Sequence, residues 1–384
     1  MDQEAEDVLS RQLRQKRAMA GPVARIDLDA LRHNLSRARE AASGCRVMAV
    51  IKADAYGHGA VEAAGALAEA DALAVARVEE GVALRRAGIS SRIVVLEGPG
   101  AAAELPLALA GDLELVIHHE SQIPWLAPAL ERASRGLRCW IKVDTGMNRL
   151  GFRPEEADAA ATVLRAVPGV VLCGVMTHLA SADLRDDPMT GRQLGRFRPL
   201  AETLAPEQSL ANSAGILGWP ASHGDWVRPG IMLYGASPFA DESADALGLQ
   251  PVMTLRTRLI AVKWCRSGET VGYGGTWRCP EDMPIGVAAI GYGDGYPRHA
   301  AAGTPVLVTG QRAALAGRVS MDMITIDLRT VPGARTGDPV VLWGDGLPVE
   351  EVATAAGTIA YELFCRLTGR VKFRYEAARP SGAD

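Results

Sequence analysis

The stretch VIKADAYGHG, which runs from Val50 to Gly59, ends a short apolar segment with a lysine and continues into a glycine-rich polar loop. A lysine at the end of a buried strand loses hydration, and this loss favours the neutral, nucleophilic amine that Schiff-base chemistry requires. A solvated surface charge is the ordinary alternative for a single lysine. Lys52 is therefore a strong candidate only if neighbouring segments bring further reactive groups beside it.

Short β-branched segments alternate with longer segments of helical period over the first two-thirds of the chain. Eight alternations predict a parallel sheet, and eight strands close a (β/α)8 barrel, with a doubly wound open sheet as the competing architecture. The expected strands are Val47–Ile51, Leu73–Ala76, Ile93–Leu96, Leu113–Ile117, Cys139–Val143, Val170–Met176, Ser209–Ala211 and Ile231–Leu233. The expected helices are Val61–Glu69, Val78–Ala87, Ile123–Ala133, Pro154–Ala166 and Arg192–Leu204.

The pattern changes near Leu247, where strand-like segments separated by turn glycines and prolines begin. We therefore predict an α/β fold in which a TIM-like (β/α)8 barrel over residues 22–244 is followed by a mainly β C-terminal domain over residues 245–384. Residues 1–21 are expected to form a polar N-terminal tail. The expected strands of the second domain are Val252–Val262, Thr270–Tyr273, Ile285–Ile290, Pro305–Val308, Ala313–Ala316, Met323–Asp327 and Pro339–Leu342.

Composition limits the class of protein. Of the 384 residues, 48% are hydrophobic and 22% are charged, and these proportions predict a folded chain with a sizeable core. A net charge of −4 without a basic stripe gives no reason to expect nucleic acid or an acidic membrane as a partner. The six cysteines are scattered without a Cys-x-x-Cys pair, and no segment resembles a signal peptide or a membrane span. We therefore expect a cytoplasmic protein.

Reactive side chains follow the ends of several expected strands, where barrel enzymes collect their catalytic groups. Each has an ordinary structural explanation by itself, but their repeated occurrence at strand ends indicates an active site. They are Lys52, Arg149, His178, Asn212 and Ser213, and Arg228 opens the last expected strand region.

The last two barrel loops suggest a cofactor. Phosphate sites in barrels often form after strands seven and eight from backbone N–H groups and small polar side chains, and Ser213 and Gly230–Ile231 occupy such positions. A reactive lysine together with a phosphate site suggests pyridoxal phosphate, whose aldehyde needs an amine. Ordinary loop polarity remains the alternative at this point.

The segment Val50–Gly59 resembles the cofactor-lysine signature of alanine racemases, which are fold-type III pyridoxal-phosphate enzymes. The resemblance extends from about residue 23 to about residue 375 and so covers nearly the whole chain. Its further motifs are Lys142–Gly151, Thr177–Ala182, Leu210–Ala214, Arg228–Gly235, Val271–Gly274, Ile290–Arg298, Gly317–Asp322 and Ala360–Arg366.

The resemblance implies a two-base racemisation in a homodimer with shared active sites. Lys52 would bind the cofactor and serve one face of the substrate Cα, while Tyr273 of the partner subunit would serve the other. A phenol needs neighbouring positive charge to act as a base near neutral pH, and His178 and Arg228 are expected to supply it. Arg228 would also face the pyridine nitrogen, where a permanently protonated group leaves the ring a weaker electron sink.

The resemblance assigns the remaining positions by role. Cofactor-binding residues would be Lys52, Tyr56, Leu96, His178, Asn212, Ser213, Arg228, Gly230, Ile231 and Tyr361. Substrate-binding residues would be Arg149, Met321 and Asp322; Lys142 would be a possible carbamylated lysine; Tyr292 and Arg298 would lie at the entrance or behind the site. No metal is expected, because the adjacent His118 and His119 cannot face one ion from a regular element.

These observations predict an enzyme that interconverts L- and D-alanine, either for the cell wall or for D-alanine catabolism. A broad-specificity or serine racemase would differ only in details of the pocket. An amino-acid decarboxylase of the same fold type would set a carboxylate against the pyridine nitrogen, where Arg228 stands here. A non-catalytic pyridoxal-phosphate-binding protein would consist of the barrel alone.

Overall fold

The computed structural model describes residues 21–377, which form two compact units. One unit is Leu28–Gln250, and the other combines the described residues up to Asp27 with those from Pro251 onward. The predicted tail, residues 1–21, lies outside the described residues except for Gly21. Within the described part, no helix has the length and apolar character needed to cross a membrane.

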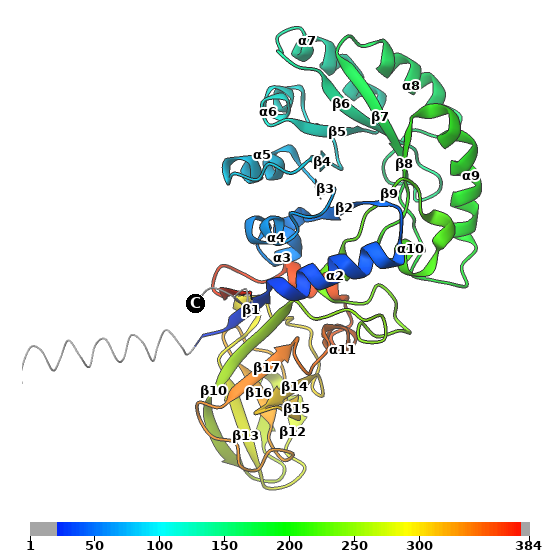
Figure 1. The fold of residues 1–384 in the computed structure, drawn as a ribbon. Helices are drawn as coiled ribbons and strands as arrows, with labels where there is room; N and C mark the ends of the chain where they lie inside the picture. The colour runs from blue at the N-terminus through cyan, green and yellow to red at the C-terminus, as the bar shows by residue number, and fades with distance from the viewer. Residues whose placement is uncertain (1–20, 378–384) are drawn as a thin grey trace, which may run out of the picture. The chain divides into compact units, whose positions relative to one another are not determined.

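The first unit is a closed barrel of eight parallel strands, so the predicted barrel is confirmed (Figure 1). Neighbouring strands follow the chain order, and β2 pairs with β9 to close the ring. The strands are β2 (Arg46–Val50), β3 (Ala72–Val75), β4 (Ile93–Val95), β5 (Leu113–Ile117), β6 (Leu137–Lys142), β7 (Val170–Met176), β8 (Glu207–Ser209) and β9 (Trp226–Val227).

Helices surround these strands, with α5 to α9 visible on the outside of the barrel in Figure 1. They are α2 (Leu28–Ala41), α3 (Lys52–Gly57), α4 (Ala60–Ala66), α5 (Val78–Arg86), α6 (Leu105–Ala110), α7 (Leu126–Leu130), α8 (Ala157–Ala166), α9 (Met189–Leu204) and α10 (Ser213–Gly218). Short 3-10 helices are η1 (Ala102–Glu104), η2 (Glu120–Trp125), η3 (Pro220–Ser222) and η4 (Ile231–Tyr234). All five expected barrel helices overlap helices in this set.

The predicted eighth strand, Ile231–Leu233, is wrong. That segment is the 3-10 helix η4, and the eighth strand is the two-residue β9. Trp226 pairs with both Arg46 of β2 and Ser209 of β8, which is enough to close the barrel. The buried apolar residues of η4 pack against α2, and a short buried apolar segment has the same composition in either conformation.

The second unit is built on a mainly antiparallel sheet, so the predicted β domain is also confirmed. Its strand order is β13-β16-β15-β14-β17-β10-β1-β18, and β13 also pairs with β10. These strands are β1 (Val23–Asp27), β10 (Met253–Cys265), β13 (Met283–Ala288), β14 (Pro305–Val308), β15 (Gln311–Leu315), β16 (Ile324–Asp327), β17 (Pro339–Trp343) and β18 (Lys372–Glu376). A separate hairpin joins β11 (Thr270–Val271) to β12 (Trp277–Arg278), and the helices are η5 (Tyr273–Gly275), η6 (Tyr292–Asp294), α11 (Val349–Ala355) and α12 (Ala360–Cys365).

The first strand belongs to this second unit, although the predicted boundaries include residues 22–27 with the barrel. β1 pairs antiparallel with β10 and parallel with β18. Its alternate residues Ala24 and Ile26 are buried, which fits a strand packed on one face only.

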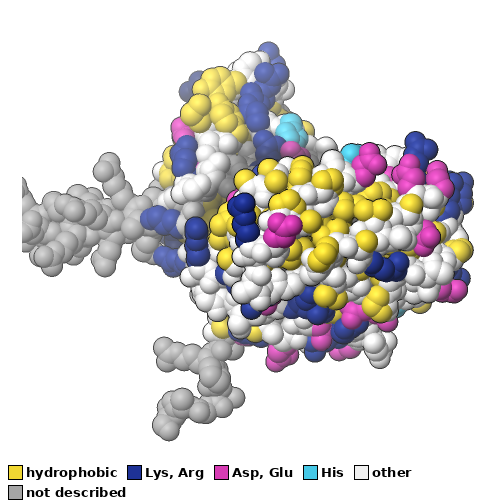
Figure 2. All heavy atoms as spheres, turned by 90° about the horizontal axis from the view of Figure 1, so that it is seen from above, with side chains coloured by type: hydrophobic (Ala, Val, Ile, Leu, Met, Phe, Trp, Pro, Cys, Tyr) yellow, Lys and Arg dark blue, Asp and Glu magenta, His cyan; other side chains and the backbone are white. Residues whose placement is uncertain are grey.

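On the face shown in Figure 2, basic and acidic side chains are interspersed with exposed hydrophobic ones.

Candidate functional site

The carboxyl ends of the barrel strands gather most of the predicted site residues, as the barrel architecture requires. Lys52 lies two residues beyond β2, and Leu96 directly follows β4. Lys142 is the last residue of β6. His178 lies two residues beyond β7, and Arg228 directly follows β9. Five residues that are far apart in the sequence therefore share one end of the barrel.

Lys52 opens α3, whose next four residues turn in the left-handed sense. Ala53 to Tyr56 all have φ of 53°, which costs an L-residue roughly 1–2 kcal/mol each. Glu80 of α5 accepts a hydrogen bond from the Ala53 amide at 2.8 Å, and the Asp54 carboxylate accepts one from the Ala60 amide at 2.7 Å. Strain held in place by surrounding contacts is typical of a functional site.

His58 supports this turn from the inside as a neutral side chain. It is fully buried, and burial lowers its pKa to about 4. Its Nδ1 lies 2.9 Å from the carbonyl oxygen of Tyr56 and 3.1 Å from that of Ala55, so Nδ1–H is the donor. The ring also packs against Tyr234, with centroids 4.6 Å apart. These contacts fix the backbone that follows Lys52.

Tyr56, Ser213 and Gly230 form a compact polar corner near Lys52. The Ser213 hydroxyl accepts hydrogen bonds from the amides of Gly230 at 2.9 Å and Met232 at 3.3 Å. A Cβ added to Gly230 would lie 2.5 Å from the Tyr56 hydroxyl, so only glycine permits this approach. No described acceptor is bonded to the Ile231 amide. Hydroxyl and backbone N–H groups of this kind are suited to phosphate oxygens.

Asn212, the neighbouring candidate, has a local structural role. Its side-chain oxygen accepts a hydrogen bond from the Gly215 amide at 2.9 Å and so caps α10. This contact holds the start of α10, where Ser213 lies.

Four cationic side chains share the mouth of the barrel without a carboxylate partner. Within residues 21–377, no Asp or Glu oxygen lies within 4.0 Å of a side-chain nitrogen of Lys52, Lys142, Arg149 or Arg228. Burial, followed by the charges of Arg228, Arg149 and Lys52, lowers the pKa of Lys142 to about 8. This end of the barrel therefore carries an excess of positive charge that favours bound anions.

His178 and Arg228 form a defined pair. Arg228 is buried and donates to the Ser209 hydroxyl and to the Thr177 carbonyl, both at 2.6 Å. Its Nη2 also lies 3.4 Å from His178 Nδ1. Because guanidinium only donates, Nδ1 is the acceptor and His178 carries its proton on Nε2. Burial and the charge of Arg228 lower the pKa of His178 well below its ordinary value, so the ring is neutral. The expectation that His178 supplies positive charge is therefore wrong, and in this pair the charge belongs to Arg228.

In the β unit, Tyr273 lies beside two predicted substrate-binding residues. An open pocket of about 430 Å³ is lined by Gly272, Tyr273, Ser320, Met321, Asp322 and Met323. The side chain of Tyr273 is 67% exposed, in the turn that joins β11 to β12. Gly272, Gly274 and Gly275 all have positive φ, which lets this tight turn project the tyrosine outward.

The segment Gly291–Gly295 packs against two of the residues that line this pocket. The amides of Tyr292 and Gly293 donate to the carbonyls of Ser320 and Met321 at 3.1 and 2.8 Å. A Cβ on Gly291 would lie 2.3 Å from the same two carbonyl oxygens, so glycine is required for close approach. Asp322 is held by Arg370, which also contacts Asp294.

The two remaining candidates of the β unit are not among the residues that line this pocket. Arg298 is exposed beyond η6, and Tyr361 is 37% exposed on α12. Within the described residues, no group of three or more His, Cys, Asp or Glu side chains is arranged to hold a metal ion.

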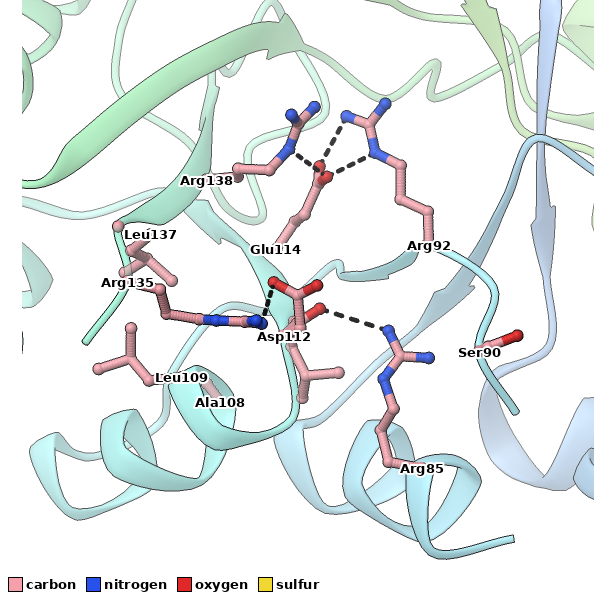
Figure 3. A pocket seen from close by; sticks show the side chains of 12 residues that line it. Arg85, Ser90, Arg92, Ala108, Leu109, Asp112, Glu114, Arg135, Leu137 and Arg138 are labelled. Atoms are coloured by element: carbon pink, nitrogen blue, oxygen red, sulfur yellow. Dashed lines mark hydrogen bonds and ion pairs between the residues drawn. The ribbon is translucent and has the colours of Figure 1, made fainter. Parts of the chain in front are cut away.

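A second pocket lies at the opposite end of the barrel, where β4, β5 and β6 begin (Figure 3). Its guanidinium groups point toward acceptors of the protein itself. Arg92 and Arg138 flank the Glu114 carboxylate, at 2.8 and 2.6 Å, and Arg135 contacts Asp112 at 2.8 Å. Arg85 donates to backbone carbonyls. These pairings close the base of the barrel, and we assign them a structural role.

Two protein-family models match this chain. The family model "Alanine racemase, N-terminal domain" matches residues 26–238, and "Alanine racemase, C-terminal domain" matches residues 252–375. The chain belongs to the alanine racemase family. The expectation drawn from the sequence motifs is thereby confirmed.

Individual relatives agree with the family match. The chain is similar to an alanine racemase from Halorhodospira halophila, with 55% identity over 351 residues, which are 91% of this chain and 96% of that protein. A second alanine racemase, from Nitrosococcus oceani, is 55% identical over 91% of this chain and 98% of its own length. The crystal structure of the biosynthetic alanine racemase from Pseudomonas aeruginosa matches with a TM-score of 0.90 and 49% identity, covering 93% of this chain and 100% of that one.

The sequence reasoning missed two side chains that support the barrel end of this alanine racemase fold. Glu80 accepts from the amides of Ala53, Ala76 and Arg77, and thus joins α5 to the left-handed turn. Gln193 lies fully buried on α9, where the buried residues that follow it on the helix, Leu194 and Phe197 among them, are apolar. A glutamine in an apolar helical stripe is the signal that could have revealed it.

Proposed function

We propose that this protein interconverts L- and D-alanine with pyridoxal 5'-phosphate as its cofactor. Lys52 would act on one face of the substrate Cα and Tyr273 of the partner subunit on the other. The observation that carries the proposal is the group of four cations without carboxylate partners beside a polar corner. A cofactor phosphate and a substrate carboxylate would supply the negative charge that these four cations lack within the protein.

The residues of the barrel fit the cofactor. The hydroxyls of Tyr56 and Ser213 and the backbone at Gly230–Ile231 would hold the phosphate, close to the Lys52 amine. When bound, pyridoxal phosphate supplies a conjugated ring that spreads the negative charge left after the Cα proton is removed. Leu96, at the end of β4, would pack against that group.

Arg228 would limit the chemistry to proton exchange. Burial lowers its pKa to about 10, so it remains protonated at neutral pH. Two of its nitrogens are engaged by Ser209 and Thr177, while no described acceptor is bonded to its Nε. Nε–H is therefore available to donate to a pyridine nitrogen but does not transfer its proton. A weaker electron sink favours return of the proton over transamination.

Proton transfer would be carried by the chain's own side chains. The Lys52 amine would hold the proton taken from one face of Cα, and the Tyr273 phenol would hold the one on the opposite face. His178, neutral with its proton on Nε2, would donate toward the phenol oxygen, and Arg228 behind it would supply the positive charge.

The substrate carboxylate would bind Arg149 and the Met321 amide. Arg149 is exposed at the barrel mouth, and no described acceptor is bonded to the Met321 N–H. Lys142 would carry a carbamate: its lowered pKa leaves a neutral amine fraction at neutral pH that adds CO2 and releases one proton. The resulting negative charge would orient Arg149.

A homodimer and a cytoplasmic location complete the proposal. Tyr273 and Met321, 67% and 53% exposed, belong to a group of exposed apolar side chains on the β unit, as expected of a surface that meets another subunit. All six cysteines are free, which fits a reducing compartment.

A chiral assay of the purified holoenzyme tests the proposal. We expect L-alanine to yield D-alanine and the reverse, with L-serine and L-lysine turned over far more slowly. Lys52→Ala should abolish both racemisation and the visible absorbance of bound cofactor. Release of carbon dioxide from any of the three amino acids, or a visible band that persists in Lys52→Ala, would contradict the proposal.

A further inference from the structure

The side chain of Gln193 joins two loops at the mouth of the barrel. It projects from the buried face of α9, together with Thr190, Leu194 and Phe197. Its amide nitrogen donates to the His178 carbonyl at 2.9 Å and to the Thr145 hydroxyl at 3.1 Å. Its amide oxygen accepts from the Ala180 N–H at 2.8 Å. Both donors and the oxygen are used, so the orientation of the amide is fixed.

The first of these loops carries Arg149. Thr145 lies four residues before Arg149 and is 1% exposed. A second residue of α9, Arg196, donates to the Thr145 carbonyl at 3.0 Å. Asp144 accepts hydrogen bonds from the amides of Gly146 and Asn148, at 2.9 and 3.0 Å. Hydrogen bonds therefore brace the loop up to Asn148, the neighbour of Arg149, and we expect a displacement of Thr145 to move Arg149 as well.

The second loop carries His178 and leads to Arg228. Gln193 contacts this loop on both sides of Leu179, at His178 and at Ala180. The hydroxyls of Thr145 and Thr177 lie 2.8 Å apart, and Arg228 donates to the Thr177 carbonyl. The buried Gln193 amide is thus connected, through at most two hydrogen bonds, to the loops that carry Arg149, His178 and Arg228.

We propose that Gln193 is a positioning residue that sets the relative placement of Arg149 and His178. The inference rests on the proposed function for the identity of the substrate, but its geometry lies entirely within the barrel unit. Gln193 touches neither substrate nor cofactor in this scheme. Its loss should weaken binding of the carboxylate and leave the cofactor corner at Tyr56, Ser213 and Gly230 intact.

The first test replaces Gln193 with Met, which preserves length and removes all three hydrogen bonds. Gln122→Met is the matched control, because Gln122 is also buried and joins two strand-end loops, accepting from the His118 amide and donating to the Pro99 carbonyl. In the holoenzyme, Gln193→Met should raise the KM for alanine about tenfold, since every 1.4 kcal/mol of lost binding is tenfold. The visible spectrum of the bound cofactor should be unchanged, and Gln122→Met should change KM less than about twofold.

A second measurement does not depend on turnover. Propionate has the carboxylate and methyl group of alanine but no amine, and its Kd for the holoenzyme can be measured by calorimetry. We expect Gln193→Met to raise this Kd about tenfold and Gln122→Met to leave it unchanged. An inactive wild-type enzyme would contradict the proposed function, yet this comparison would still decide the role of Gln193.

A double-mutant cycle identifies the route. Thr145→Val removes the hydroxyl that Gln193 contacts while keeping the side-chain shape, and it also serves if Gln193→Met fails to fold. We expect Thr145→Val to raise the KM and the propionate Kd several-fold, and the double variant to be no worse than Gln193→Met. Equal effects of Gln193→Met and Gln122→Met on KM and on the propionate Kd would overturn the proposal. Strictly additive effects of Gln193→Met and Thr145→Val in the double variant would overturn it too.

Discussion

Charge at single residues explains why this barrel mouth needs anions. Lys142 is 8% exposed, and its neighbours Arg228, Arg149 and Lys52 all oppose its protonation. His178 responds to the same field by remaining neutral. The positive charge is therefore a cost to the folded protein until a phosphate, a carboxylate or a carbamate is bound.

The Lys142 side chain predicts a pH-dependent stability. Its pKa falls from 10.5 to about 8 on folding, so the unfolded chain binds more protons between these values. The penalty is complete below about pH 8 and disappears as the pH rises toward 10.5. Lys142→Met should therefore raise the free energy of unfolding of the cofactor-free protein by about 1–3 kcal/mol at pH 7, and by little near pH 10.

Chemical denaturation in CO2-free buffer at both pH values measures this difference. The exposed Lys263 on β10 provides the control, and Lys263→Met should have a small effect of the same size at both pH values. A gain for Lys142→Met that does not decrease with pH would show that packing, rather than charge, is responsible.

The identities of the barrel-mouth residues could be predicted at this scale, whereas their partners could not. The positions of Lys52 and His178 after strand ends follow from the alternating pattern, whereas that pattern predicts Arg228 before the last strand and it instead directly follows β9. Gln193 was not predicted as a site residue, because its role depends on contacts with loops 15 and 48 residues away in the sequence, which no local pattern encodes. The neutral state of His178 likewise depends on burial and on the charges of four residues from three separate segments.

The left-handed turn of α3 is the most unusual element. Its residues Ala53, Asp54, Ala55 and Tyr56 are not glycine, so nothing in their composition predicts positive φ. The turn persists because Glu80 and His58 bond its backbone, and because the Asp54 carboxylate accepts a hydrogen bond from the Ala60 amide at the start of α4. An element stabilised by tertiary contacts in this way is not readable from the sequence.

This turn predicts opposite effects for the same substitution in two helices. Ala53→Gly relieves strain at an exposed left-handed position and should raise the free energy of unfolding by about 0.5–1 kcal/mol, after the entropy cost of glycine in the unfolded chain. Ala83→Gly, at an exposed position of the right-handed α5, should lower it by about 1 kcal/mol. Urea denaturation of both variants gives the comparison, and a loss of similar size in both would disprove a strained turn.

The hydrophobic pattern does not predict two other features of the fold, the eighth barrel strand and the sheet that β1 joins. β9 has only two residues, too few for a hydrophobic period, while the apolar residues of η4 satisfy a strand pattern without forming one. β1 has the alternation of a strand, but alternation does not specify the sheet that it joins, and it pairs with β10 and β18.

The two ends of the barrel differ in how their charged side chains are paired. The carboxyl end concentrates unpaired cations, whereas at the opposite end Glu114 neutralises Arg92 and Arg138 and accepts from Trp140. Burial alone would raise the pKa of Glu114, but these hydrogen bonds and charges hold it below its ordinary value of 4.5. The carboxylate therefore joins β4, β5 and β6 where the strands begin.

Glu114→Gln should lower the free energy of unfolding by about 2 kcal/mol at neutral pH, because it removes the charge that two guanidinium groups share. Since folding depresses the pKa, this contribution is present above about pH 4.5 and is lost as the pH falls below it. Denaturation from pH 7 to 3.5 measures the difference, with Glu202→Gln on the exposed face of α9 as control. A difference that stays constant down to pH 3.5 would exclude the ion pairs as its cause.

The central claim is that Lys52 and Tyr273 serve opposite faces of the alanine Cα. It is tested most directly by exchange of the Cα hydrogen with D2O, followed separately for L- and D-alanine. The wild-type holoenzyme should exchange both enantiomers. Tyr273→Phe should lose exchange of one enantiomer about 100-fold or more while retaining most exchange of the other, through Lys52. Equal loss for both enantiomers, or no loss for either, would contradict the two-base account.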